Sequence, residues 1–481
     1  MKKLLLVLIP LALFGQVVVD TVIRFPREPG YACFFPELNK LYEGDGGSGL
    51  FVLDCSTYQL KPEIPEPLGL AHNHWSWNWR RQKLYLTRYT GDTRADSTLV
   101  IDVAGDSVLG WLPVFREFYN DVYLSDIDAR FKPEVDTLYE YDCAADTAIR
   151  RLPIHSTCAS WDSVGHKLYV GQGSLKKLYV YDYLADSCLK VIDVSAVDAM
   201  MPDALIFGTN HRAYVSSFQT QPLSATNLGI VDTERDTLLG VLPVRLQENL
   251  YTQVAVDERD GKVYVTDCDG ILGTPDTMWV VDCATDSVLK KFECVHMGNT
   301  DMCIRWVPWS NRIYLANFGP DSTNGGSLVV IDCNTDSVIV PKMLLGDGGQ
   351  IYDITLDPIH QRVFVTGGDT NTVYVLRDTG YGIAEAKPSG PRPASGLQVR
   401  TMPGWFDLRY SLASPCRVDL SVYDLMGRAV RRLVAEKRSA GPHSGVWNCQ
   451  DLHGNRAARG VYFIRLDTPG FRDVKKAVVT R

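Results

Sequence analysis

The chain alternates short apolar segments with polar turns, and one phrase of this kind recurs along most of its length. An apolar strand ends in Asp, three residues follow, and a second Asp with Ser or Thr opens another apolar strand. Alternating β-branched and aromatic residues bounded by Gly, Asn and Asp predict strands, and helical periodicity is nearly absent. The Asp pairs stand at 102 and 106, 142 and 146, 182 and 186, 232 and 236, 282 and 286, and 332 and 336, and a weaker copy has Asp54 with Tyr58.

The first Asp residues of successive copies are 48, 40, 40, 50, 50 and 50 residues apart, a period typical of propeller blades or solenoid repeats. Each unit is expected to hold four antiparallel strands, A to D, with the Asp pair capping the C–D turn. A second phrase marks strand B of each unit. Its copies are Lys40-Leu41-Tyr42, Lys83-Leu84-Tyr85, Lys167-Leu168-Tyr169, Arg212-Ala213-Tyr214, Lys262-Val263-Tyr264, Arg312-Ile313-Tyr314 and Arg362-Val363-Phe364.

The units contain eight A, eight B and eight C strands but only seven D strands. Asp20-Thr21-Val22-Ile23 has the opening of a D strand, so the N-terminal segment is expected to complete the last unit and close a ring. Asp20 to Asp378 is 359 residues, or about 45 per unit for eight units. The fold class predicted for residues 16–378 is therefore all-β, a closed β-propeller of about eight four-stranded blades. Seven blades is the alternative, because strand B of the third unit is degraded at Phe131-Lys132-Pro133.

The strand-B phrases resemble the YVTN family of β-propeller repeats. The matching residues are Tyr264-Val265-Thr266, Phe364-Val365-Thr366 and Tyr314-Leu315-Ala316-Asn317, each followed by the Asp that ends strand C. The resemblance covers about residues 20 to 378. It implies the fold and not the function, because such propellers serve as enzymes, cofactor holders and binding scaffolds.

The N-terminus predicts export. Met1-Lys2-Lys3 precedes an apolar run from Leu4 to Phe14, so residues 1–15 are interpreted as a signal peptide. That run is too short to cross a bilayer, which takes about 20 apolar residues, and no later stretch predicts a transmembrane segment. With 481 residues, 45% of them hydrophobic and 22% charged, the chain is not of the disordered class.

The repeat stops after Asp378, and residues 379–396 form a linker rich in Pro, Gly and Ser. Residues 397–481 predict five or six short strands, which suits a small Ig-like β-sandwich. Val422-Tyr423-Asp424 through Arg428, then Gly441-Pro442-His443, then Gly460-Val461-Tyr462-Phe463 resemble the Ig-like domain of flagellar hook-capping proteins and the type A C-terminal sorting domain of the type IX secretion system. That resemblance implies contact with secretion machinery, and secretion or display on the outer surface of a Gram-negative-type bacterium.

Charge divides unevenly between the two parts. Residues 396–481 hold 15 Lys and Arg against 7 Asp and Glu, whereas the rest of the chain holds 34 against 50. The net charges are thus +8 and −16. An acidic propeller is not expected to bind nucleic acid.

The chain has twelve cysteines, and two disulfides are predicted, Cys294 with Cys303 and Cys416 with Cys449. Four other cysteines each follow the first Asp of a repeat and therefore lie one blade apart, too far to be bridged to one another. They are Cys55, Cys143, Cys283 and Cys333.

Binding is expected on the face that carries the B–C and D–A connections, because the B–C loops vary most in length there. Aligning the A strands predicts a ring of side chains at the channel mouth, in which carboxylates and a histidine could hold a divalent cation, either Ca²⁺ or a transition metal. Trp79 is the tryptophan of the Trp75–Trp79 run that is expected to be exposed. The ring consists of Tyr31, His74, Asp121, Cys158, Asp203, Gln253, Cys303 and Asp353, of which His74, Asp121, Asp203 and Asp353 are the candidate metal ligands.

These patterns favour a secreted or cell-surface binding or scaffold protein over an enzyme. We expect a monomer that binds a protein or glycan ligand at the loop-rich face, with no firm cofactor. The alternative is a metal-assisted lactonase- or lyase-like propeller enzyme, in which the channel-mouth cation polarises a carbonyl.

Overall fold

The structure is a computed structural model of the 481-residue chain. It describes the following residues: 17–27, 29–36, 38–45, 49–65, 75–78, 80–88, 97–113, 122–124, 127–134, 137–154, 156, 158–162, 165–172, 175–197, 201–218, 228–244, 254–267, 277–294, 301–317, 326–345, 351–358, 360–367, 371–378, 397–402, 405–412, 415–424, 428–439, 441–451, 455–468 and 471–479. The predicted signal peptide and linker lie outside these residues.

Within the described part of residues 17–378, the strands form eight antiparallel sheets, numbered here sheet 1 to sheet 8 in the order of their A strands. The A strands are β2 (Pro29–Phe35), β7 (Trp75–Asn78), β11 (Val122–Leu124), β15 (Cys158–Asp162), β19 (Met201–Phe207), β23 (Val254–Asp257), β27 (Asp301–Val307) and β31 (Ile351–Asp357). The B strands are β3 (Lys40–Asp45), β8 (Lys83–Arg88), β12 (Ala129–Glu134), β16 (Lys167–Gln172), β20 (Arg212–Phe218), β24 (Lys262–Asp267), β28 (Arg312–Asn317) and β32 (Arg362–Gly367).

The C strands are β4 (Gly49–Asp54), β9 (Ser97–Asp102), β13 (Thr137–Asp142), β17 (Lys177–Asp182), β21 (Leu228–Asp232), β25 (Thr277–Asp282), β29 (Ser327–Asp332) and β33 (Thr372–Asp378). The D strands are the short pair β5 (Gln59–Leu60) and β6 (Ile64–Pro65), then β10 (Ser107–Pro113), β14 (Thr147–Leu152), β18 (Ser187–Asp193), β22 (Thr237–Leu242), β26 (Val288–Glu293), β30 (Ser337–Leu344) and β1 (Val17–Arg24). A single 3₁₀ turn, η1 (Ser195–Val197), follows β18.

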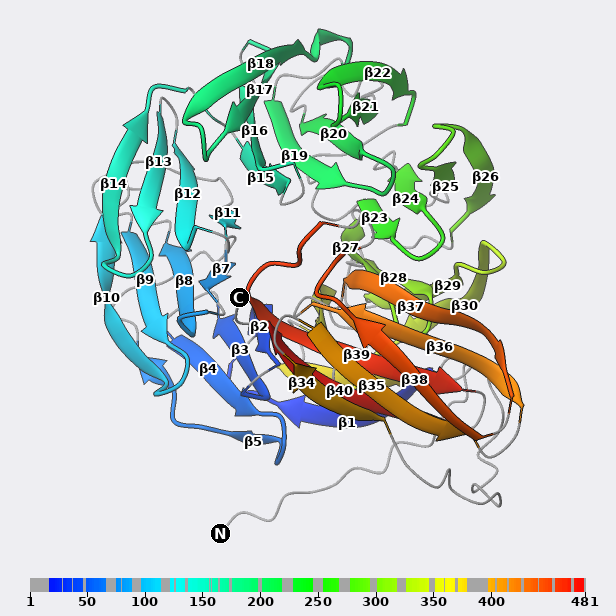
Figure 1. Ribbon diagram of the computed structural model, residues 1–481. Coiled ribbons are helices and arrows are strands. Elements are labelled where there is room, and N and C mark those ends of the chain that lie inside the picture. Colours follow the sequence, from blue (N-terminus) through cyan, green and yellow to red (C-terminus); the bar gives the residue numbers. More distant parts are fainter. Residues whose placement is uncertain are drawn as a thin grey trace.

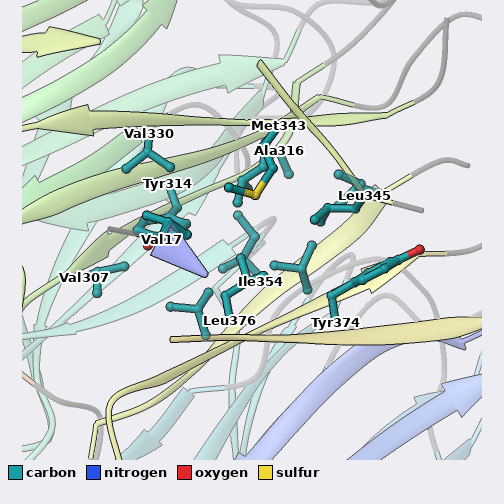
Figure 2. Packing of buried hydrophobic residues seen from close by; sticks show 14 of the residues in the cluster. Val17, Val307, Tyr314, Ala316, Val330, Met343, Leu345, Ile354, Tyr374 and Leu376 are labelled. Atoms are coloured by element: carbon teal, nitrogen blue, oxygen red, sulfur yellow. The ribbon is translucent and has the colours of Figure 1, made fainter. Parts of the chain in front are cut away.

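The N-terminal strand supplies the fourth strand of the last sheet. β1 pairs with β33, from Val17 opposite Asp378 to Arg24 opposite Thr372, which confirms that the N-terminal segment completes the last sheet. The strand begins at Val17 and not at Asp20, which is skipped in the pairing. Figure 1 shows the sheets arranged around a common centre. A buried apolar cluster fills every junction between successive sheets, including the junction of sheet 8 with sheet 1. At the junction of sheets 7 and 8, Val17 lies among Val307, Tyr314 and Leu376 (Figure 2).

The two Asp residues of each repeat have different roles. The first caps the C–D turn: Asp282 Oδ1 accepts hydrogen bonds from the backbone N–H groups of Ala284 and Thr285, at 2.8 and 2.7 Å. The second adopts a left-handed conformation, as at Asp286 with φ 57° and Asp336 with φ 49°. Asp and Asn tolerate this region better than other non-glycine residues, which explains why the turn places Asp there.

The second Asp also joins its sheet to the preceding one. Lys262 of β24 donates to both carboxylate oxygens of Asp336, at 2.8 and 2.9 Å, and the hydroxyl of Tyr264 donates to the same carboxylate. We call this arrangement a clasp: a cationic side chain and a tyrosine of strand B in one sheet bind an Asp carboxylate of the next sheet. The other clasps are Lys40 and Tyr42 with Asp106, Lys83 and Tyr85 with Asp146, Lys167 and Tyr169 with Asp236, Arg212 with Asp286, and Arg312 and Tyr314 with Asp378.

Removing one clasp hydroxyl should have a measurable cost. We expect Tyr264→Phe to lower the free energy of unfolding by about 1–2 kcal/mol, because the partly buried, charged carboxylate of Asp336 loses the hydrogen bond that the Tyr264 hydroxyl donates. Denaturant unfolding measures the change. A double-mutant cycle with Lys262→Met should show coupling, and strictly additive losses would mean that the two side chains do not share Asp336.

The junction of sheets 3 and 4 has a different construction. Strand β12 carries Ala129 and Phe131 in the places of the clasp cation and tyrosine, so Asp186 is left 56% exposed. Its ion-pair partner among the described residues is Arg150 of β14. Tyr183 fills this junction, packing in one cluster with Ala129 and Phe131. The degraded third repeat thus still forms a four-stranded sheet, and an aromatic side chain fills its junction with the next one.

The outer strands share a β-bulge. In the D strands of sheets 2 to 7, the third residue after the second Asp is skipped in the pairing register with strand C. In sheet 1 the outer strand is instead broken into β5 and β6. Bulges and short edge strands oppose edge-to-edge pairing with other chains. The bulged residues are Leu109, Ile149, Leu189, Leu239, Leu289 and Ile339.

The C-terminal residues form two further sheets around their own core. One sheet holds β34 (Gln398–Met402), β35 (Trp405–Leu412) and β38 (Gly441–Trp447), and the other holds β37 (Ala429–Arg438), β36 (Cys416–Tyr423), β39 (Gly460–Thr468) and β40 (Phe471–Val479). Trp447 is fully buried and stacks on Phe406 with ring centroids 5.4 Å apart. We call residues 397–479 the C-terminal module.

The predicted disulfides are wrong, because all four of their cysteines are free thiols. Cys294 follows the outer strand of sheet 6, whereas Cys303 lies on the inner strand of sheet 7. Cys416 starts β36 near the Leu412 end of the strand pair β35–β38, and Cys449 follows its opposite end at Trp447. The first predicted pair is thus separated across the width of the sheets, and the second along the length of the strands. Among the residues that the structure describes, no helix has the length and apolar character needed to cross a membrane.

Candidate binding face and channel mouth

The sheets present two different faces. The A–B and C–D turns lie on one, here the turn face, and the B–C and D–A connections lie on the other, here the loop face. The Asp pairs and the clasp residues all lie toward the turn face. The repeated polar residues are thus used in capping the turns and joining the sheets at the turn face.

The predicted channel-mouth ring can be followed in part. Cys158, Cys303 and Asp353 hold the same register, opposite Gly171, Ala316 and Thr366 of their B strands. In β19 the residue opposite Ser216 is Ala204, so Asp203 is offset by one position after a register shift. Tyr31 and Asp203 lie within β2 and β19, but their side chains are outside the described residues, as are the whole of His74, Trp79, Asp121 and Gln253.

Asp353 is 7% exposed and joins three sheets. Its Oδ1 accepts the backbone N–H of Ile354 at 2.8 Å, and its Oδ2 accepts that of Ala32 in β2 at 3.2 Å. The Cys303 thiol donates to Oδ1 at 3.4 Å, and the Arg305 guanidinium lies 3.5 Å from the same atom. Burial raises the pKa of the Cys303 thiol to about 12, so this sulfur is a hydrogen-bond donor at neutral pH.

Sequence reasoning missed a second carboxyl group at this junction. Glu43 of β3 is fully buried, and neither of its oxygens has a hydrogen-bond partner among the described residues. Burial, with the nearby negative charge of Asp353, raises the pKa of Glu43 well above its usual value. The repeat itself carried the signal, because the equivalent strand-B position holds Leu86, Val170, Val215, Val265, Leu315 and Val365 in other sheets.

The described residues contain no group of three or more His, Cys, Asp or Glu side chains arranged to hold a metal ion. Of the four candidate ligands, only the side chain of Asp353 is described. Its oxygens accept backbone N–H groups on both sides of the last junction, which is a structural role.

No family model matches the chain, and no curated protein matches it. A solved structure does: the crystal structure of BamB from Moraxella catarrhalis superposes with a TM-score of 0.53 at 10% sequence identity, covering 75% of this chain and 99% of that one. The chain has a β-propeller-like fold. We call sheets 1 to 8 blades 1 to 8. The likeness to BamB is one of fold alone.

Proposed function

We propose that the protein is a non-enzymatic binding or scaffold propeller of eight blades, which takes a protein or glycan ligand on its loop face. The observation that carries the proposal is the division of chemistry between the two faces. The clasps and capped turns use the repeated polar side chains toward the turn face, whereas the connections of the loop face differ between blades in length and composition. Variable loops on a rigid scaffold are the usual place for recognition.

The proposal extends to the rest of the chain. Residues 1–15 are a signal peptide, 16–378 the closed propeller, 379–396 a linker, and 397–481 an Ig-like sorting module that carries the protein to the cell surface or beyond it. The bulged and interrupted outer strands support a monomer, because they oppose pairing at the rim. Mass spectrometry of the exported protein tests the sorting role: a chain that ends near residue 396 agrees with processing of the module, and an intact C-terminus on freely secreted protein argues against it.

Shortening the loops tests the binding role. Full-length protein is applied to an array of surface glycans and purified surface proteins, and each hit is measured again with residues 268–276 replaced by a short turn. We expect binding to weaken at least tenfold, because the ligand contacts the long B–C loops. Glu234→Lys, an exposed change on the turn face, serves as the control. Binding that survives loop shortening but is lost in the control would reverse the assignment of the faces.

The alternative is a metal-assisted lactonase- or lyase-like enzyme with His74, Asp121, Asp203 and Asp353 at the channel mouth. One observation favours this alternative: the buried Glu43 lies near Asp353 and adds a second carboxyl group at that junction. Metal analysis of the purified protein separates the two functions. About one tightly bound equivalent of metal, lost in the Asp203→Ala/Asp353→Ala variant, would support the enzyme; less than that supports the binding protein.

A further inference from the structure

One turn on the turn face is buried, unlike the corresponding turns of its neighbours. In blade 7 the A–B turn runs from Val307 to Arg312, and Trp309, Ser310 and Asn311 are 6%, 5% and 0% exposed. In blades 6 and 8 the same turn includes exposed residues. Turns normally lie at the surface, because burying their backbone removes it from water. Contacts within the propeller account for part of this burial, because Trp309 packs in the cluster at the junction of sheets 7 and 8. Ser310 donates a hydrogen bond to Asp378, and Asn311 donates one to Asp260. The turns on either side of this one contact another part of the chain.

Contacts with the C-terminal module lie on both sides of it. In the A–B turn of blade 6, the Glu258 carboxylate accepts the backbone N–H of Ala429, with the Arg428 guanidinium nearby. Burial raises the pKa of Glu258 to about 7, and Arg428 opposes that rise. In the A–B turn of blade 8, the amide oxygen of Gln361 accepts a hydrogen bond from Arg472 of β40. Figure 1 shows the module in front of β28 and β30 of blade 7.

One face of the module also lacks the exposure expected of a free surface. In β39, Ile464 belongs to the module's core, so the adjacent Phe463 and Arg465 face away from it. Phe463 and Arg465 are nevertheless 7% and 8% exposed. Arg465 lies over the ring of Tyr423, 4.4 Å from its centroid, on the same outer face. Phe463, Arg465 and Tyr423 thus lie on the outer face of the sheet β37-β36-β39-β40. The same sheet supplies Ala429 and Arg472, which contact the propeller.

We propose that the outer face of this four-stranded sheet is a docking surface for the turn face of the propeller, and that it spans the A–B turns of blades 6 to 8. The partner is thus the acidic propeller of the same chain, net −16 against the module's +8. Charge complementarity orients the two bodies, and Phe463 supplies apolar area that the contact removes from water. The docked module covers the turn face and leaves the loop face free for a ligand.

Cleavage of the intact protein tests the docking. A protease site is placed in the linker, residues 379–396, and the cut protein is run by size exclusion at about 50 mM and about 1 M NaCl, because salt screens charge pairing between exposed groups. We expect the two fragments to elute together at low salt and to separate at high salt. Hydrogen exchange of residues 307–312 should accelerate at least tenfold once they separate, while exchange of the blade 5 turn, residues 208–212, stays unchanged.

Substitutions then locate the contact. Glu258→Lys should separate the cut fragments at low salt, and adding Arg428→Glu should restore part of the association. Glu234→Lys makes the same charge change on the turn face of blade 5 and should have no effect. The proposal is overturned if the wild-type fragments separate at low salt with residues 307–312 equally protected, or if Glu234→Lys separates them as well as Glu258→Lys does.

Discussion

Replacing Asp378 by alanine is expected to lower the free energy of unfolding by about 3–5 kcal/mol, because it leaves a buried guanidinium without its carboxylate. Asp378 ends β33 in the last blade and is 1% exposed. It accepts hydrogen bonds from Arg312 at 2.6 Å, from Tyr314 at 2.7 Å and from Ser310 at 2.6 Å. The clasp between blades 7 and 8 therefore depends on one side chain, opposite Val17 of β1.

Denaturant unfolding with a tryptophan signal measures this change, and Asp186→Ala is its matched control. Asp186 is the second Asp of the repeat in blade 4, the residue that forms the clasp in most other blades, but it is 56% exposed and has Arg150 as its ion-pair partner. Exposed ion pairs contribute about 0–1 kcal/mol, so the control should stay within that range. Equal losses in the two variants would mean that burial of the clasp carboxylate does not determine its contribution.

The sequence predicts the strand order and the role of the N-terminal strand well, because both depend on a repeat that is visible without coordinates. The Asp pair and the Lys-x-Tyr phrase are found as separate motifs. Their contact is not predicted, because it joins residues more than 60 positions apart, such as Lys262 and Asp336. For the same reason, the sequence does not predict that Tyr183 fills the space left where Ala129 replaces the clasp cation, because these residues are also far apart along the chain.

The candidate site was predicted less well, for two physical reasons. Strand alignment assumes that every A–B turn has one length, and in blade 5 Gly208 pairs with Arg212, one residue closer than in the other blades. This shift in β19 puts Ala204, and not Asp203, opposite Ser216 of strand B. Glu43 was overlooked because an acidic residue in a strand is usually read as solvent-exposed. Comparison across the repeats would have marked its position as apolar.

Glu43→Leu is expected to stabilise the protein, by about 1–3 kcal/mol at pH 7, because an unpartnered buried carboxyl group is costly. The repeat itself offers leucine at this place, as Leu86 and Leu315. Both of those side chains are at most 1% exposed, so the apolar interior between blades accommodates leucine at this position of strand B. The reverse change, Leu315→Glu, should cost about 3 kcal/mol or more, because it buries a carboxyl group in the cluster at the junction of blades 6 and 7.

The pH dependence separates a buried acid from a partnered carboxylate. Because burial raises the pKa of Glu43 in the folded state, its contribution is most favourable below the unfolded value of about 4.3. It is lost as the pH rises from there toward the raised folded pKa, since the unfolded chain releases the proton first. Unfolding free energies at about pH 4, 6 and 8 should therefore fall more steeply for the wild type than for Glu43→Leu. If the substitution instead destabilises the protein and leaves the pH profile unchanged, Glu43 is ionised and held by a bound cation, and Asp353 is then its nearest candidate co-ligand.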